Sequence, residues 1–404
     1  MKTALMYGGG NIGRGFVGAL FSLSGYRVNF VDVAKGVVDE LREKQRYPIR
    51  IVSNAGCEDI MIENVSAVDG NDTQATAEAI AECDIMATAV GARILKFIVP
   101  NIVAGLRKRW AEGARPLNII ICENLNDANR ILEGMIRELL SDEEQALFTE
   151  TVGLVEASIG RMVPVQTDEM KDGEPLRVCV ERYGFLPVDK SAFKGKIPVV
   201  KGMVPSEPFD FYVKRKLFVH NMGHATTTYL GDIFAYPLIC EAIADADIRI
   251  IVREAMTESA IALSRRYDVP LDALVLHICD LVGRFGNAAL KDTCARVGAD
   301  PARKLSPDDR LSGALTLAVE QGITPVYICA GIAAGMRRYL AEAGMAFSVE
   351  NARKVLSEVC HISPSEPVSG IILRFCEMIR GGITPAALRK EADAMKAASL
   401  HNII

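Results

Sequence analysis

The chain has no pair of closely spaced cysteines. Its ten cysteines are scattered through 404 residues, and no two of them form a Cys-x-x-Cys pair. A disulfide framework or a structural zinc site would require tighter spacing. We therefore expect reduced thiols, most of them in the core, as in a cytosolic protein.

Long apolar runs and an excess of positive charge are also missing. The longest apolar stretches, 117–122 and 323–334, are too short or too interrupted to span a bilayer. No secretory signal pattern precedes the first apolar run, so we expect a cytoplasmic protein without membrane contact. The net charge of −5 and the pI near 5.7 give no general attraction to nucleic acid.

The chain does contain a glycine-rich turn directly after its first apolar run, residues 1–7, which predicts a buried strand. The glycines occupy the first, third and sixth positions of the turn. They are Gly8, Gly10 and Gly13. In dinucleotide-binding domains this spacing permits a tight turn, close approach of a pyrophosphate and close packing of helix on strand. The N–H groups near Asn11 and Ile12 would face the phosphates. A glycine turn in an unrelated α/β protein is the alternative.

A carboxylate follows at the distance that such a domain requires. Residues 17–24 predict an apolar helix, and residues 27–31 predict a second strand that finishes at Asp32. A carboxylate about 20 residues past the glycines can hydrogen-bond both hydroxyls of an adenosine ribose. It would repel a 2′-phosphate, which favours NAD over NADP, although Lys35 could soften that preference.

Strands and helices alternate through the first half of the chain. Residues 84–91 and 117–124 predict buried strands, 95–112 predict a helix between them, and weaker strand patterns occur at 47–52 and 176–185. Ala89 and Val90, at the end of one buried strand, are expected beside the glycine turn as part of the cofactor site. Four prolines between 187 and 208 interrupt the pattern, and helical periodicity dominates beyond them.

We therefore predict an α/β fold with two domains. An N-terminal Rossmann-type doubly wound sheet, residues 1–200, binds the cofactor, and a mainly α-helical C-terminal domain, residues 201–404, carries the substrate and catalytic site.

Three polar residues in the run 213–224 are candidates for proton transfer. On a regular α-helix Lys216, Asn221 and His224 would project at about 0°, 140° and 80° and share one face. A proton acceptor, an amide and an imidazole could there surround one substrate oxygen. His220 would also lie on this face, where a packed or substrate-adjacent imidazole is the simpler interpretation.

These motifs resemble those of the polyol-specific long-chain dehydrogenases, whose signature Lys-x4-Asn-x2-His is matched by residues 216–224. Within that family the chain is most similar to the enzymes that act on mannitol 1-phosphate. The shared segments are GGGNIGRGF (8–16), TAVG (88–91), LNIIICEN (117–124), residues 215–225 in part, and the long segment 283–311.

The resemblance implies a metal-independent hydride transfer to NAD. Lys216 would be the general base, Asn124 and Asn221 would hold the developing alkoxide, and His224 would orient substrate and lysine. An ordinary lysine is protonated at neutral pH, so Lys216 needs desolvation or a cationic neighbour to lower its pKa.

The phosphate end of a substrate would need cations, which are dense between residues 284 and 310. The resemblance favours Arg303 and Lys304, with Arg284, as phosphate ligands; a solvated cluster paired with nearby aspartates is the alternative. The chain departs from the family pattern at Gly160, where relatives carry an aspartate, and at Ala288, where they carry a proline. Both changes concern the identity of the polyol.

We therefore expect reversible oxidation of a hexitol phosphate, mannitol 1-phosphate to fructose 6-phosphate, by a monomer or weak homodimer. An enzyme that acts on an unphosphorylated polyol or a hexuronate is the alternative within the family. A third hypothesis is a sensor that binds NAD and a sugar phosphate without turnover. Lys216 argues against it, because a binding protein needs no proton acceptor.

Overall fold

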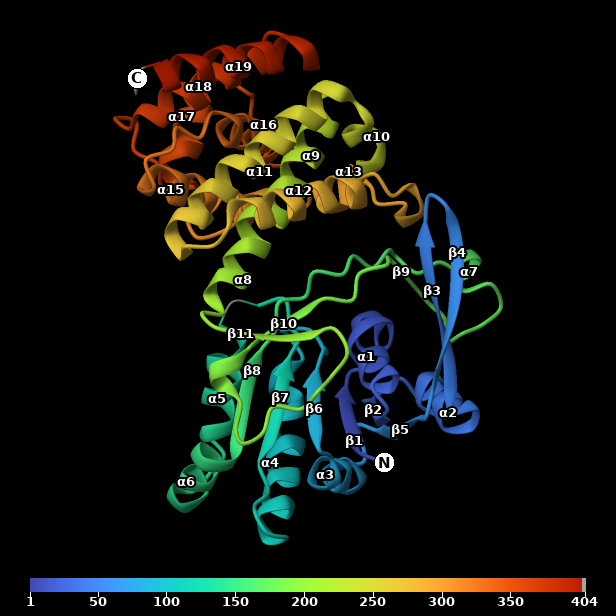
Figure 1. Cartoon of the computed structure of the whole chain (residues 1–404). Coiled ribbons are helices and arrows are strands. Elements are labelled where there is room, and N and C mark those ends of the chain that lie inside the picture. Colours follow the sequence, from blue (N-terminus) through green and yellow to red (C-terminus); the bar gives the residue numbers. More distant parts are fainter. Residues whose placement is uncertain (126, 402–404) are drawn as a thin grey trace. The chain divides into compact units, whose positions relative to one another are not determined.

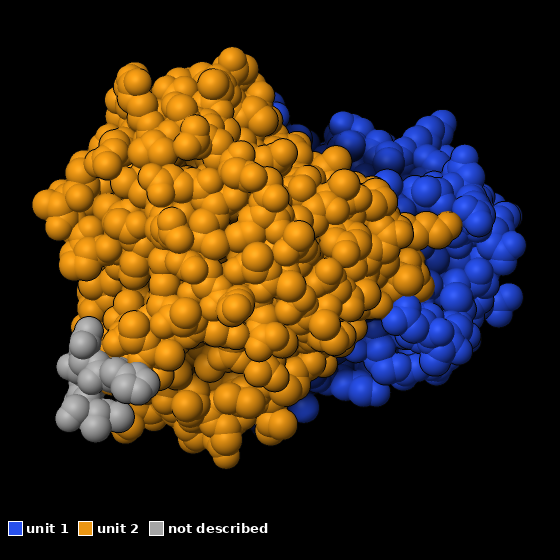
Figure 2. Space-filling view, turned by 90° about the horizontal axis from the view of Figure 1, so that it is seen from above, with its two compact units in different colours: residues 1–210 blue, residues 211–404 orange. Residues whose placement is uncertain are grey.

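The computed structural model describes residues 1–125 and 127–401. Its chain forms two compact units, Met1–Asp210 and Phe211–Ile404, which Figure 2 colours separately. In the described residues, none of the helices combines the length and apolarity needed to cross a bilayer.

The first unit is built on a six-stranded, entirely parallel sheet (Figure 1). In spatial order its strands are β5 (Val65–Asp69), β2 (Arg27–Asp32), β1 (Thr3–Tyr7), β6 (Ile85–Thr88), β7 (Leu117–Ile121) and β8 (Val152–Glu156). Along the chain this is the order 3-2-1-4-5-6 of a doubly wound dinucleotide-binding sheet. The order reverses between β1 and β6, so a ligand site is expected at the carboxyl ends of these two strands.

Side chains of the sheet alternate between two cores. In β1, Ala4 and Met6 belong to one hydrophobic cluster, whereas Leu5 and Tyr7 belong to the other. This alternation follows from the two-residue period of a strand, and both faces are apolar because helices cover both. The covering helices are η1 (Gly13–Val17), α1 (Gly18–Leu23), α2 (Lys35–Lys44), α3 (Thr73–Glu82), α4 (Leu95–Ala111), α5 (Ala128–Arg137) and α6 (Asp142–Thr151).

Two smaller sheets complete the first unit. One has the order β4-β3-β9, and the other pairs β10 with β11. Their bounds are β3 (Arg46–Ser53), β4 (Gly56–Glu63), β9 (Val178–Val180), β10 (Leu186–Asp189) and β11 (Met203–Ser206), with the short helices α7 (Asp168–Lys171) and η2 (Lys190–Ala192). The strand predicted at 47–52 therefore exists, but it lies outside the parallel sheet.

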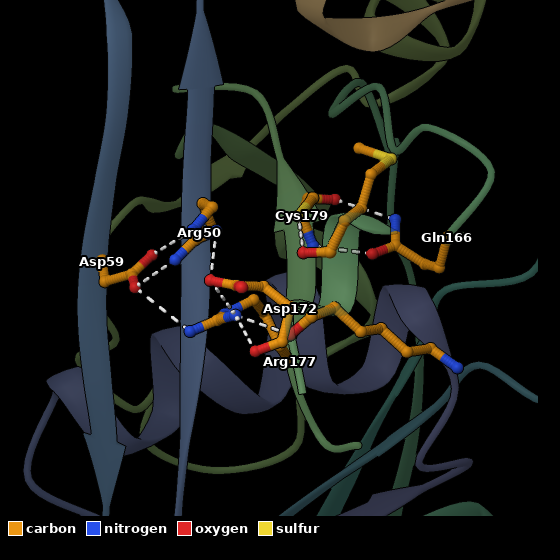
Figure 3. Close-up of polar contacts among 8 residues, drawn as sticks. Arg50, Asp59, Gln166, Asp172, Arg177 and Cys179 are labelled. Atoms are coloured by element: carbon orange, nitrogen blue, oxygen red, sulfur yellow. Dashed lines mark hydrogen bonds and ion pairs between the residues drawn. The ribbon is translucent and has the colours of Figure 1, made fainter. Parts of the chain in front are cut away.

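A network of alternating charges joins the strands of the β4-β3-β9 sheet (Figure 3). Asp59 of β4 lies 2.7 Å from Nε of Arg50 and 3.4 Å from Nη2 of Arg177. Asp172 lies 3.3 Å from Arg50 and 3.2 Å from Arg177. Each cation thus contacts two carboxylates, on a sheet whose other face packs Ile49, Ile51 and Val178 into the core.

The second unit is helical. Its elements are α8 (Asp210–Arg215), η3 (Lys216–Asn221), α9 (Met222–Ile233), α10 (Ile239–Ala244), α11 (Ala246–Tyr267), α12 (Leu271–Phe285), η4 (Ala288–Leu290), α13 (Cys294–Val297), α14 (Pro301–Leu305), α15 (Ser312–Glu320), α16 (Val326–Glu342), α17 (Val349–Glu358), α18 (Pro367–Arg380) and α19 (Pro385–His401). The predicted fold class is confirmed: a Rossmann-type parallel sheet followed by a mainly helical unit.

One buried carboxylate connects three helices of this unit. Glu258 of α11 is 3% exposed and accepts hydrogen bonds from the backbone N–H groups of Tyr327 (3.0 Å) and Ile328 (3.1 Å), at the start of α16. Lys396 of α19 completes the arrangement, since its Nζ lies 2.9 Å from Glu258 and donates to the carbonyl of Thr324. The C-terminal helix α19 is therefore linked to α11 and α16 by an ion pair whose carboxylate is almost fully buried.

Replacing Lys396 by methionine should lower the free energy of unfolding of this unit by about 3 kcal/mol, because Glu258 would lose its counter-ion. Urea unfolding measures the change. Lys390→Met, at an exposed position of the same helix, is the control and should leave the midpoint nearly unchanged. Equal midpoints for the two variants would show that the ion pair contributes nothing.

Candidate functional site

The glycine turn and Asp32 form one connected structure at the end of β1. Asp32 Oδ2 accepts a hydrogen bond of 2.7 Å from the N–H of Gly9, and its Oδ1 accepts one from Ala34. Gly8 adopts φ +102°, and a Cβ there would lie 2.5 Å from the carbonyl oxygen of Ala89. A Cβ at Gly13 would lie 1.9 Å from the carbonyl oxygen of Gly8. The first and last glycines are therefore required by sterics.

Gly10 differs from these two glycines. A Cβ at this position would meet no atom of the described residues within 4 Å. Asn11 beside it is exposed and Ile12 is half-buried. An open glycine between two packed ones is what close approach of a pyrophosphate to the backbone requires, so these residues fit a dinucleotide.

Glu123 holds the loop after β6 in place, a role that the sequence did not reveal. It is 8% exposed, and its two carboxylate oxygens accept hydrogen bonds from the N–H groups of Val90 (3.0 Å) and Gly91 (2.8 Å). The Ala89–Gly91 loop is thereby tied to the end of β7, where the exposed Asn124 follows directly. A carboxylate placed just after a buried strand was the available signal.

In the second unit the predicted catalytic run contains a helical irregularity. Residues Lys216–Asn221 form a π turn, η3, and the N–H of Met222 accordingly bonds to the carbonyl of Leu217, five residues earlier. The assumption of a regular α-helix is therefore wrong at this point. In a π turn the residue five positions on, here Asn221, takes the place above Lys216 that an α-helix would give to His220.

Burial sets the protonation of the groups on this helix. Burial, and secondarily the positive charge of Arg310, lower the pKa of Lys216 to about 8. Burial also lowers the pKa of His224 to about 4, with Asp292 acting in the opposite direction. The pKa of His220 lies well below its ordinary value for the same reason. Near neutral pH both imidazoles are therefore uncharged, and Lys216 is the group that can exchange a proton.

The two imidazoles pack against an aromatic ring. His224 stacks on Phe285 of α12 with ring centroids 5.0 Å apart, and His220 lies 5.8 Å from the same ring. His224 Nε2 is 3.9 Å from Asp292 Oδ2, beyond hydrogen-bond distance, and Asp292 is paired with Arg296. The ring orientation of His224 is thus set by stacking.

The predicted phosphate ligands already have partners within the chain. Lys304 is 5% exposed, and its Nζ donates to the carbonyls of Val297 and Ala299. Arg303 donates to Asp300 (2.7 Å) and to Asp309 (3.0 Å). Arg303 is thus paired with aspartates, as in the alternative, whereas Lys304 is buried and bonds to backbone carbonyls.

Two further cations belong to this region. Arg310 donates from Nε to Asp309 at 2.7 Å, which holds the guanidinium whose charge acts on Lys216. Arg284 lies 3.3 Å from Asp280 on the same helix, α12. Arg310 was one of six cations in the segment 284–310, and nothing in the sequence distinguished it from the other five.

The two positions that depart from the family pattern lie in different units. A Cβ at Gly160 would lie 3.1 Å from the Tyr183 ring, so any larger residue there requires that ring to shift. Ala288 begins the short helix η4. The described residues contain no group of three or more His, Cys, Asp or Glu side chains placed to hold a metal ion.

Two sequence profiles cover most of the chain. That of the mannitol dehydrogenase Rossmann domain matches residues 2–202, and that of the mannitol dehydrogenase C-terminal domain matches residues 209–359. The chain belongs to the mannitol dehydrogenase family. The resemblance to polyol dehydrogenases is thereby confirmed.

Solved structures share the fold of this family member. Mannitol 2-dehydrogenase of Pseudomonas fluorescens, solved as a ternary complex with NAD and D-mannitol, is 16% identical over 96% of this chain and 94% of its own, with a TM-score of 0.72. A substrate-free D-sorbitol dehydrogenase is 14% identical over 94% of this chain and 93% of its own, with a TM-score of 0.79. At these identities the likeness concerns the fold.

Replacing Glu123 by glutamine should loosen the Ala89–Gly91 loop, because the amide NH₂ would face a backbone N–H where an oxygen now accepts. We expect hydrogen exchange of the segment 88–94 to accelerate about 10-fold or more. Mass spectrometry of the exchanged peptides measures this effect. Glu112→Gln, at an exposed position of the same unit, should leave the segment unchanged; equal exchange in both variants would contradict the role of Glu123.

Proposed function

We propose that the protein is an NAD-dependent polyol dehydrogenase in which Lys216 is the general base. The observation that carries this proposal is the low pKa of Lys216, about 8, on a turn that also presents Asn221. An amine that is partly unprotonated near neutral pH can take the proton of a hydroxyl group. A protein that only binds its ligand has no need of such a group.

The cofactor supplies the hydride acceptor when it is bound. Three features of the first unit fit this cofactor. The open Gly10 fits its pyrophosphate, and the Asp32 carboxylate fits its ribose. The Ala89–Gly91 loop, which lies beside the glycine turn, completes the site. The Asp32 carboxylate would repel a 2′-phosphate, and this repulsion supports NAD over NADP.

The protein's own groups would handle the proton and the oxygen. Lys216 removes the hydroxyl proton during oxidation and returns it during reduction. Asn221 donates from its amide to the developing alkoxide, and by resemblance Asn124 is the second amide. His224, uncharged and stacked on Phe285, orients the hydroxyl by hydrogen bonding.

For the substrate we propose a hexitol phosphate, with mannitol 1-phosphate and fructose 6-phosphate as the reacting pair of a mannitol-1-phosphate 5-dehydrogenase activity. In support, three cations, Arg296, Arg310 and Lys304, act to lower the pKa of His224, although the opposite effect of Asp292 is larger than that of any one of them. A group of cations near His224 suits an anionic substrate. The resemblance of the segment 283–311 points the same way.

A second candidate, oxidation of an unphosphorylated polyol or reduction of a hexuronate, is favoured by a different observation. Arg303 and Lys304 are already engaged by Asp300, Asp309 and backbone carbonyls. Releasing them for a phosphate would cost those contacts.

The pH dependence of turnover tests the base. Because the free amine is needed for oxidation, kcat for polyol oxidation should rise with pH and level off above about 8, where Lys216 loses its proton. Ketose reduction needs the ammonium and should fall over the same range. Lys216→Ala should lower kcat at least about 10²-fold while NADH affinity is retained. Near-normal turnover in that variant would exclude lysine from the mechanism.

Substrate choice is tested by NADH consumption with fructose 6-phosphate, fructose and a hexuronate. We expect the phosphorylated ketose to react with the highest kcat/KM. If a cation of the 284–310 segment binds the phosphate, Arg303→Gln should raise KM for fructose 6-phosphate about 10-fold and leave the KM for fructose unchanged. Arg380→Gln, at an exposed arginine of the same unit, is the control. Preference for fructose or the hexuronate would establish the second candidate.

A further inference from the structure

A buried arginine reaches back from the first helix to the glycine turn. Arg14 belongs to the π turn η1 and is 6% exposed. Its Nη1 donates a hydrogen bond of 2.5 Å to the carbonyl oxygen of Gly9, and its backbone N–H donates to the carbonyl of Gly10. Both contacts fall on the turn proposed above to receive the cofactor's phosphates.

Gly9 is therefore held from two sides. Its N–H donates to Asp32 Oδ2, and its carbonyl accepts from Arg14. In a trans peptide the C=O of one residue and the N–H of the next point in opposite directions. A guanidinium that fixes the Gly9 carbonyl thus directs the Gly10 N–H away from itself. Since the Cβ position of Gly10 faces open space among the described residues, a ligand has room to approach the backbone at this peptide.

The positive charge of Arg14 is poorly compensated within the described residues. Its Nε is buried and has no hydrogen-bond partner among them, and its Nη1 bonds to a neutral carbonyl. Burial lowers the pKa of Arg14, while Tyr47 and Asp32 act to raise it. The oxygens of Asp32, however, already accept backbone N–H groups. A buried cation in this situation gains from the approach of an anion.

Arg109, another buried arginine of the same unit, allows a comparison of hydrogen-bond partners. It is 3% exposed, and its guanidinium donates to four backbone carbonyls, those of Arg115, Ala81, Cys83 and Pro116. All three of its nitrogens have a partner. Arg14, at similar burial, has an unpartnered nitrogen and lies beside the site of an anionic ligand.

We infer that Arg14 is a positioning residue for the pyrophosphate of the dinucleotide. It acts through the Gly9–Gly10 peptide, which it sets with the N–H outward, and through a buried positive charge behind the turn. This inference rests on the proposed binding of NAD, and it names a residue that the glycine spacing and Asp32 do not include.

The test compares Arg14→Met, Arg14→Lys and the control Arg27→Met, which alters an exposed arginine of the same unit. NADH and ADP-ribose affinities are measured by calorimetry, and adenosine binding by ligand-observed NMR. For Arg14→Met we expect Kd for NADH and ADP-ribose to rise about 10- to 100-fold, the range of a charge-assisted hydrogen bond. Adenosine, which lacks the pyrophosphate, should bind as to the unaltered protein. Arg14→Lys should recover part of the loss because it keeps the charge.

Three results would overturn the inference. One is an unchanged NADH affinity in Arg14→Met while the unaltered protein binds NADH. Another is a parallel loss of adenosine and NADH, since it would show that Arg14 maintains the whole turn, including Asp32, rather than the pyrophosphate position. The third is no recovery in Arg14→Lys when its thermal midpoint equals that of the unaltered protein. Failure of the unaltered protein to bind NADH would instead refute the proposed function.

Discussion

The parallel pairing of β1 with β2 and β6 is the constraint on which the cofactor half of the molecule depends. Tyr7, the last residue of β1, is in register with Val31 of β2 and Thr88 of β6. Since the three strands run in the same direction, the residues that follow them emerge at one edge. Gly8, Asp32 and Ala89 therefore meet there, and the meeting is close enough that a side chain at Gly8 would collide with Ala89.

The contacts at this edge form a continuous set rather than a list of separate binding residues. Asp32 and Arg14 hold Gly9 from its two sides, and Glu123 holds the loop after β6 by two backbone N–H groups. Each contact uses a charged group to fix backbone, which leaves the peptide N–H groups of the turn oriented before any ligand arrives. Pre-orientation of this kind reduces the entropy lost on binding.

In the second unit, the main effect of burial is on the pKa values of polar side chains. Burial lowers the pKa values of Lys216, His220 and His224, but only that of Lys216 comes to about 8. Both imidazoles stay uncharged at neutral pH, so among these three groups Lys216 is the one that can exchange a proton there. Arg310 reinforces the effect on Lys216 and is itself held by Asp309. Desolvation therefore assigns different roles to neighbouring polar groups of one helix.

The sequence by itself determined the parts that depend on near neighbours along the chain. Apolar runs and helical periodicity indicated β2, β6, β7, α4 and α12, and the glycine spacing with Asp32 indicated the cofactor turn. Tertiary structure decided the rest. Ile49 pairs with Val178, far along the chain, which draws β3 into a separate sheet. The π turn at Lys216–Asn221, the engagement of Arg303 and Lys304 by the chain itself, and the nearness of Arg310 to Lys216 likewise follow from packing. The preference of a segment for strand, helix or turn depends on adjacent residues. Ion pairing and desolvation depend instead on which distant segments are brought together.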